Sequence, residues 1–119
     1  MHTAIHPLIE THSGTRITIV FNVRDAAGNL LVLDEASAEY RLARRAGERA
    51  LLSLGSGGGG AILIEGSAVH ITLDTTDLPG GALGDFFGQL RLTIGGQTLV
   101  AAEGPLCVHP VILPAEESA

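Results

Sequence analysis

The chain has 119 residues and a formal net charge of −6, and it contains no lysine, so its seven basic side chains are all arginines. This balance argues against binding to nucleic acid or to an anionic membrane, because both attract clustered basic groups. A chain of this length buries roughly two-thirds of its unfolded surface in one core. We therefore expect residues 1–119 to form a single domain, with flexible ends at about 1–4 and 114–119.

Cysteine usage and the first residues bear on the compartment. Cys107 is the single cysteine, so no intrachain disulfide is possible, and an unpaired thiol suits a reducing compartment. Residues 1–15 lack the basic start and the apolar run of a signal peptide. We expect a protein of the cytoplasm, or of a particle that is assembled there.

Apolar residues recur at every second position, in short runs that end at glycine, proline or Asp/Asn turns. In residues 16–24 the odd positions are apolar and the even positions are mostly polar, which is typical of a half-buried strand. Of the candidate strands, seven or eight should form. They lie near 4–9, 15–24, 30–33, 37–45, 50–54, 61–65, 68–74, 86–94 and 97–109, the last bent or broken near Gly104 and Pro105.

Turn signals separate these strands. Residues 25–29 have the spacing of a type I turn followed by a left-handed glycine, 45–49 form a hairpin tip, and Gly95 and Gly96 form a two-residue hairpin connection. Residues 75–81 can hold one helical turn capped by threonine or aspartate. Frequent short strands with regular turns predict an all-β fold. The expected form is an immunoglobulin-like antiparallel β-sandwich of about seven to eight strands, in preference to a barrel.

Ligand-binding motifs are weak. Residues 55–60 match the glycine spacing of a dinucleotide-binding loop, but a strand follows them where a helix is required, so they read as a flexible loop. His2 and His6 have helical spacing, yet Pro7 makes a helix there doubtful. We therefore expect no metal and no cofactor.

Catalytic motifs are weak as well. Alternation places Cys107 and His109 on one face of an extended segment, without requiring them to be within reach of each other. We expect Cys107 to be a small, buried or half-buried residue, and we expect that the protein is not an enzyme.

Two stretches, 17–30 and 38–44, resemble the opening of small immunoglobulin-like virion proteins of tailed bacteriophages, such as the N-terminal domain of the phage baseplate upper protein. The pattern continues with a glycine-rich loop before an Ile-x-Ile strand at 57–64, a Pro-Gly corner at 78–80 and a strand at 86–94. Residues 81–84 are extra to it. The resemblance thus spans roughly 15–109.

The resemblance implies a structural role without catalytic residues. The chain would be a tail, baseplate, head-decoration or adaptor protein, located in the virion and assembled in the bacterial cytoplasm. Its partners would be other virion proteins and copies of itself. Two other readings stay open: a carbohydrate- or host-surface-binding module, which the scarcity of Tyr and Trp disfavours, and an accessory domain bound tightly to a larger catalytic chain.

Apolar residues that break the alternation mark candidate contact surfaces. Val20 and Phe87 fall on outward faces, and 108–114 stays apolar although its prolines interrupt a regular ladder. We expect 106–114 to act as an assembly arm, with folding back onto its own domain as the alternative, and the domain to stay folded when truncated after Cys107. Arginines near the 45–49 tip can bind carboxylates of a partner, or can simply be solvated. The predicted interface residues are Val20, Phe87, Val108, Val111, Ile112, Leu113, Arg44, Arg45 and Arg49.

Overall fold

A computed structural model describes residues 3–56 and 60–112 of the chain. More than half of these residues lie in strands, and the helices are two single 3-10 turns, which confirms the all-β class. The strands are β1 (Ala4–Ile5), β2 (Ile9–His12), β3 (Arg16–Asn22), β4 (Ser37–Ala43), β5 (Leu52–Gly55), β6 (Ile62–Glu65), β7 (Ala68–Asp74), β8 (Gly84–Ile94) and β9 (Gln97–His109). Two short 3-10 helices, η1 (Thr75–Asp77) and η2 (Pro79–Gly81), connect β7 to β8.

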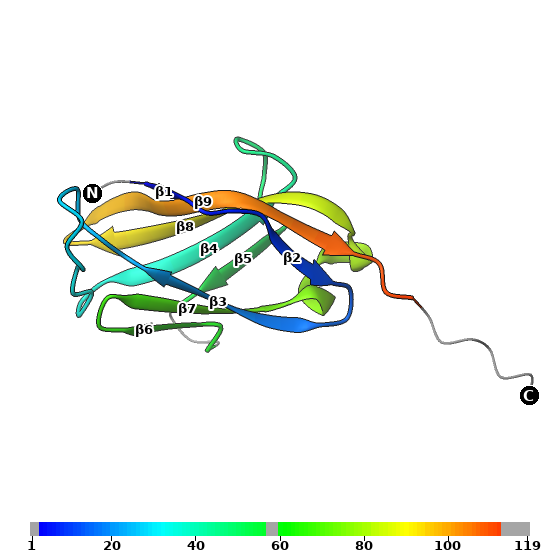
Figure 1. The fold of residues 1–119 in the computed structure, drawn as a ribbon, viewed down its shortest axis with the longest axis horizontal. Helices are drawn as coiled ribbons and strands as arrows, with labels where there is room; N and C mark the ends of the chain where they lie inside the picture. Colours follow the sequence, from blue (N-terminus) through cyan, green and yellow to red (C-terminus); the bar gives the residue numbers. More distant parts are fainter. Residues whose placement is uncertain (1–2, 57–59, 113–119) are drawn as a thin grey trace, which may run out of the picture.

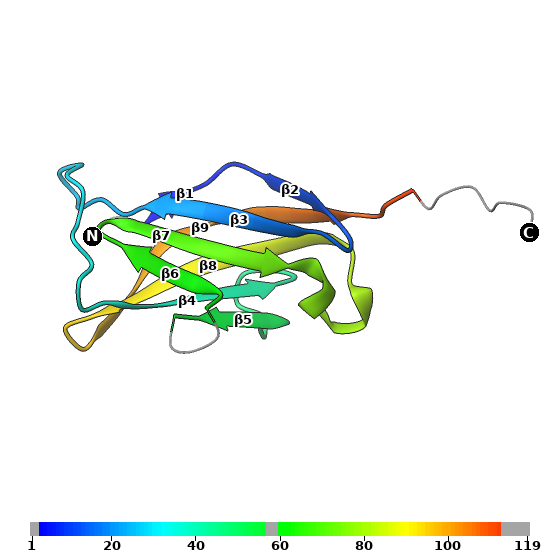
Figure 2. The same ribbon diagram turned by 90° about the horizontal axis from the view of Figure 1, so that it is seen from below.

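The strands form two sheets that stack as two layers (Figures 1 and 2). The larger sheet has the order β1-β9-β8-β4-β5, with β2 also paired to β9, and the smaller sheet has the order β3-β7-β6. Strands β9, β8 and β4 correspond to the G-F-C sheet of an immunoglobulin fold, extended by β5, and β3, β7 and β6 correspond to its B-E-D strands. The predicted sandwich is confirmed.

The core lies between the layers, where alternate residues of each strand meet. In β7, for example, Val69, Ile71 and Leu73 are fully buried while the residues between them are half-buried. Burial of one such aliphatic side chain contributes about 1.5–3 kcal/mol to folding. The largest fully buried side chains are Tyr40, Leu42, Val69, Ile71, Leu73, Leu90, Leu92, Leu106 and Val108.

The predicted strand at 30–33 does not form. Only an isolated bridge joins Arg24 to Leu30, and the segment carries the chain from β3 in the smaller sheet to β4 in the larger one. The apolar side chain of Leu33 is buried, as the alternation predicts, and is 3% exposed. It packs into the core from a connection that crosses between the sheets, and not from a strand within a sheet.

The expectation of a fully antiparallel sandwich is wrong at one edge. The single strand predicted at 4–9 is two short strands, β1 and β2, and both pair with β9 in parallel. Pro7 lies between them, and it has no N–H to donate to a ladder.

Strand β9 runs unbroken through Gly104 and Pro105, where a bend or break was expected. The Glu103 carbonyl accepts a hydrogen bond from the His6 N–H, so the backbone of Pro105, two residues on, faces the same edge. The Pro105 nitrogen faces the gap between β1 and β2, so its missing N–H removes no hydrogen bond from either ladder. The interruption falls in the edge strand, between β1 and β2, and β9 itself continues.

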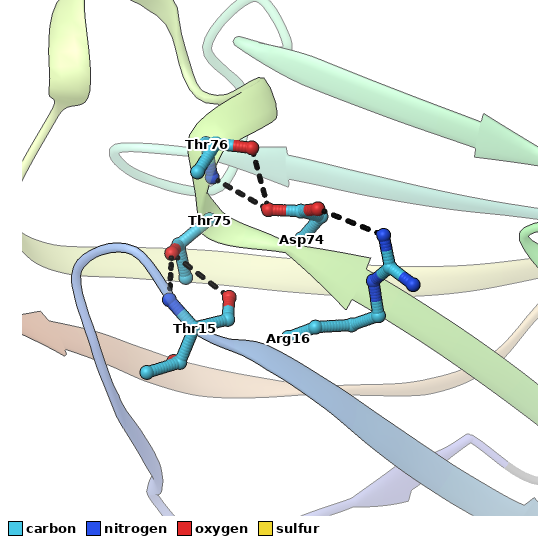
Figure 3. A network of polar contacts seen from close by, with 5 residues as sticks. All are labelled: Thr15, Arg16, Asp74, Thr75 and Thr76. Atoms are coloured by element: carbon cyan, nitrogen blue, oxygen red, sulfur yellow. Dashed lines mark hydrogen bonds and ion pairs between the residues drawn. The ribbon is translucent and has the colours of Figure 1, made fainter.

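A network of threonines joins β3 to the end of β7 (Figure 3). The buried Thr75 hydroxyl donates to the Thr15 carbonyl and accepts from the Thr15 N–H, each at 3.0 Å. Asp74 caps η1 by accepting from the Thr76 N–H at 3.0 Å and from its hydroxyl at 2.6 Å, and these bonds hold the pKa of Asp74 below its usual range. Arg16 pairs with Asp74 at 3.3 Å. The predicted capped helical turn is confirmed.

Two predicted turns also form. The Gly28 N–H donates to the Asp25 carbonyl, and Gly28 has a φ of 87°, as a left-handed turn glycine requires. Gly95 and Gly96, with φ values of 57° and 81°, connect β8 to β9 in a two-residue hairpin.

Candidate protein-interaction site

One hollow on the described surface lies on the outer face of the larger sheet, below the hairpin that joins β4 to β5. Its volume is about 630 Å³. The hairpin projects from the body of the sandwich (Figure 1). The side chains that carry its chemistry are Arg41, Arg45, Arg49, Ser53, Phe87 and Gln89. The predicted interface residues Phe87, Arg45 and Arg49 thus share one site.

Strand register brings these residues together. Arg41 pairs with Gln89, and the next outward pair along the two strands is Ala43 with Phe87. Their neighbours in the chain point into the core, so alternation directs these side chains outward. Phe87 is half-buried, which leaves part of an aromatic face in contact with solvent inside a ring of polar groups.

The hollow carries three guanidinium groups that are engaged to different degrees. Arg41 pairs closely with Glu39, and the two side chains are 45% and 39% exposed. Arg45 is 84% exposed and lies 3.8 Å from Glu48, and within the described residues Arg49 has no ion pair. Exposed ion pairs contribute about 0–1 kcal/mol, so Arg45 can exchange its present carboxylate for that of a partner at little cost.

Arg44 does not belong to this hollow, contrary to its predicted place in the arginine cluster. Its guanidinium donates to the Leu83 carbonyl at 2.6 Å and to the Asp85 carbonyl at 3.2 Å. It also lies 4.2 Å from the centroid of the Phe86 ring. Arg44 therefore fastens the end of β4 to the start of β8, which is a role within its own chain.

Val20 is exposed, as alternation predicted, but it lies on the other layer. It is opposite His70 in β7, and Leu63 of β6 is opposite His70 on the other side. Val20 is 49% exposed and Leu63 is 55% exposed. The two lie on either side of His70 on the outer face of the smaller sheet, so Val20 and Phe87 do not share a surface.

The predicted assembly arm is shorter than expected. Leu106 and Val108 are at most 1% exposed and belong to the core, so their assignment to a contact surface is wrong. Strand β9 ends at His109, and beyond it Val111 is 45% exposed and Ile112 is 98% exposed. Leu113 lies outside the described residues. We define the arm as the segment that begins at Pro110.

The structure adds a carboxylate, that of Glu10, to Cys107 and His109, which alternation already places on one face. The Cys107 Sγ lies 3.9 Å from His109 Nδ1, and His109 Nε2 lies 3.1 Å from Glu10 Oε1. The parallel pairing of β2 with β9 places Glu10 opposite Cys107, and no local sequence signal indicates such pairing.

The order thiol, imidazole, carboxylate is that of a nucleophilic triad, but the electrostatics oppose it. Desolvation, followed by the Asp85 carboxylate, raises the pKa of the Cys107 thiol. The thiol is therefore kept protonated, whereas a nucleophilic cysteine needs a lowered pKa.

Within residues 3–56 and 60–112, no group of three or more His, Cys, Asp or Glu side chains is arranged to hold a metal ion. Across the same residues, no helix has the length and apolar character to span a membrane.

No protein-family model matches this chain, and no curated protein matches it significantly. The surfaces that bear on function are the hollow with Phe87 and the arginines, the exposed residues Val20 and Leu63, and the exposed apolar arm.

Proposed function

We propose that this chain is a structural component of a tailed-phage or phage-like virion, a tail, baseplate, head-decoration or adaptor protein that acts through protein-protein contacts. The observation that carries the proposal is the arm. Ile112 is 98% exposed three residues beyond the end of β9, whose side chains Leu106 and Val108 are buried in the core. An aliphatic side chain in this position lowers the free energy of the system only when another surface covers it.

The hollow below the β4–β5 hairpin supplies a second contact. Phe87 offers an apolar surface, and Arg45 and Arg49 offer paired donors for carboxylates. Arginine and aromatic side chains are enriched among the residues that dominate protein interfaces. The hollow is thus suited to an acidic, partly apolar segment of a neighbouring virion protein.

The virion assignment itself comes from the resemblance at 17–30 and 38–44. The raised pKa of the Cys107 thiol agrees with a role without catalysis. In this proposal the protein needs no cofactor and is assembled with the particle in the bacterial cytoplasm.

The test is to isolate particles from cells that express the gene together with its chromosomal neighbours, and to quantify the chain in them by mass spectrometry. The proposal predicts a fixed copy number that sediments with the particles through a density gradient. A chain found only in the unassembled fraction would contradict it.

The same hollow also fits the alternative of a carbohydrate-binding module. A half-buried aromatic ring, Phe87, lies beside Gln89 and Ser53, which are hydrogen-bonding groups that a sugar can use. A glycan array separates the two readings. Saturable binding of one glycan class that is lost in Phe87→Ala would favour this alternative, whereas an array without signal favours a protein partner.

A further inference from the structure

A second hollow, of about 410 Å³, lies where β1, the end of β3 and the middle of β9 meet. Its floor is apolar, and its rim belongs to the turn that follows β3, where Ala26 and Ala27 are exposed. The floor includes Phe21, Val23, Ala101 and Ala102, of which the last three are at most 6% exposed. The hollow therefore has an apolar floor, and Asn22, Arg24 and Asp25 line it beside the small residues of the turn.

Strand β1, which lines this hollow, and the arm that follows β9 lie at opposite ends of the sandwich (Figure 1). Strand β9 passes the hollow at Ala101 and Ala102 and then runs eight residues to Pro110, about 26 Å in an extended strand. Val111 and Ile112 continue away from the sandwich (Figures 1 and 2). The arm therefore points away from the hollow of its own molecule, and it is free to contact a second molecule.

Both surfaces carry apolar side chains. Val111 is 45% exposed and Ile112 is 98% exposed, and Phe21 and Ala4 line the recess. Arg24 and Asp25, of opposite charge, line it as well.

We propose that the arm of one copy seats Val111 and Ile112 in this hollow of a second copy. The inference rests on the assembly role of the arm in the proposed function, and it names this chain itself as the partner. Because two different patches meet, the contact is heterologous: the copy that gives its arm keeps a free hollow, and the copy that receives it keeps a free arm. Copies therefore associate head to tail, into a ring if the rotation closes and into an open row if it does not.

Sedimentation velocity of the purified full chain tests this with two variants. Ile112→Asp removes the apolar knob at a residue that is 98% exposed, and Ala26→Trp fills the mouth of the hollow from an exposed turn. The wild type is expected to associate as its concentration rises, and each variant alone to stay monomeric, with affinity reduced at least tenfold. An equimolar mixture of the two should form heterodimers and nothing larger, because only one intact arm and one intact hollow can meet.

Val32→Asp is the matched control, since Val32 is 71% exposed and does not line the hollow, and it should associate like the wild type. A monomeric wild type, a mixture that stays monomeric, or Ile112→Asp that associates normally would each overturn the inference. Ala26→Trp with normal association would overturn it too, by showing that the hollow is not the surface that receives the arm. A chain that is present in particles but monomeric in solution defeats this inference alone, and one that associates in solution but is absent from particles defeats only the proposed function.

Discussion

At the scale of single residues, the core is organised around Tyr40 and the glycine that faces it. Tyr40 is 1% exposed, and within the described residues its hydroxyl has no hydrogen-bond partner. Gly88 lies close by on β8, where a methyl group would come within 2.0 Å of the Tyr40 Oη. Gly88 is therefore required by a close approach and not by a turn.

Burial raises the pKa of Tyr40 from 10.0 to about 12. The folded state thus prefers the neutral phenol, and this preference contributes about 2–3 kcal/mol that is fully present below pH 10 and is lost as the pH rises from 10 through 12. Tyr40 is the single tyrosine and the chain has no tryptophan, so tyrosinate absorbance reports this residue alone. We expect its titration in the native protein about two units above that in urea. Titration near pH 10 in the native protein would contradict the burial of this ring.

We expect Gly88→Ala to destabilise the protein by about 1–3 kcal/mol, because the added methyl group displaces the buried ring. Tyr40→Phe should be close to neutral, since it removes a buried hydroxyl that lacks a partner. Urea unfolding of Gly88→Ala, Tyr40→Leu and the double variant measures the coupling. The double variant should be more stable than the sum of the two losses predicts, and simple additivity would show that the two residues do not touch.

At the scale of elements, the end of β9 separates the domain from its arm. Val108 is 1% exposed and pairs with Thr11, and His109 pairs with His12. Truncation after Cys107 removes both pairs together with one core side chain, so it should cost at least about 1.5–3 kcal/mol. Truncation after His109 should leave the melting temperature unchanged. An equal loss in both truncations would mean that the arm packs on its own domain.

Sequence pattern predicts the long strands well, because each buries one face and alternates over much of its length, as β7 does throughout. It fails where tertiary pairing decides the outcome. The parallel partners of β9, two and four residues long, carry no local signal of their direction, and 30–33 alternates although it only crosses between sheets. The break expected near Pro105 does not form, because whether a proline interrupts a ladder depends on the edge that its nitrogen faces.

The candidate site shows the same division. Phe87 could be predicted from alternation, and Arg45 and Arg49 from their place at a hairpin tip. That the three share one hollow depends on the register of β4 with β8, which a single sequence does not reveal. The intrachain role of Arg44 could not be foreseen either, since its acceptors are carbonyls of Leu83 and Asp85, about forty residues away.

At the scale of the whole molecule, the two-layer architecture places its contact surfaces in different directions. The hollow that contains Phe87 lies on the outer face of the larger sheet. Val20 and Leu63 are exposed on the outer face of the smaller sheet. The arm leaves the sandwich at the end of β9 (Figure 1). A molecule with several distinct patches can contact different neighbours at once, as a component of a repeating assembly must.

The most direct measurement of the assembly role is a competition for places in the particle. Full-length chain and chain truncated after His109 are expressed together in equal amounts, and their ratio in purified particles is read by mass spectrometry. Burial of Val111 and Ile112 contributes about 1.5–3 kcal/mol for each side chain before the costs of association, so full-length chain should outnumber truncated chain by at least about tenfold. Equal amounts of the two chains in the particles, with equal melting temperatures in solution, would contradict the role of the arm in assembly.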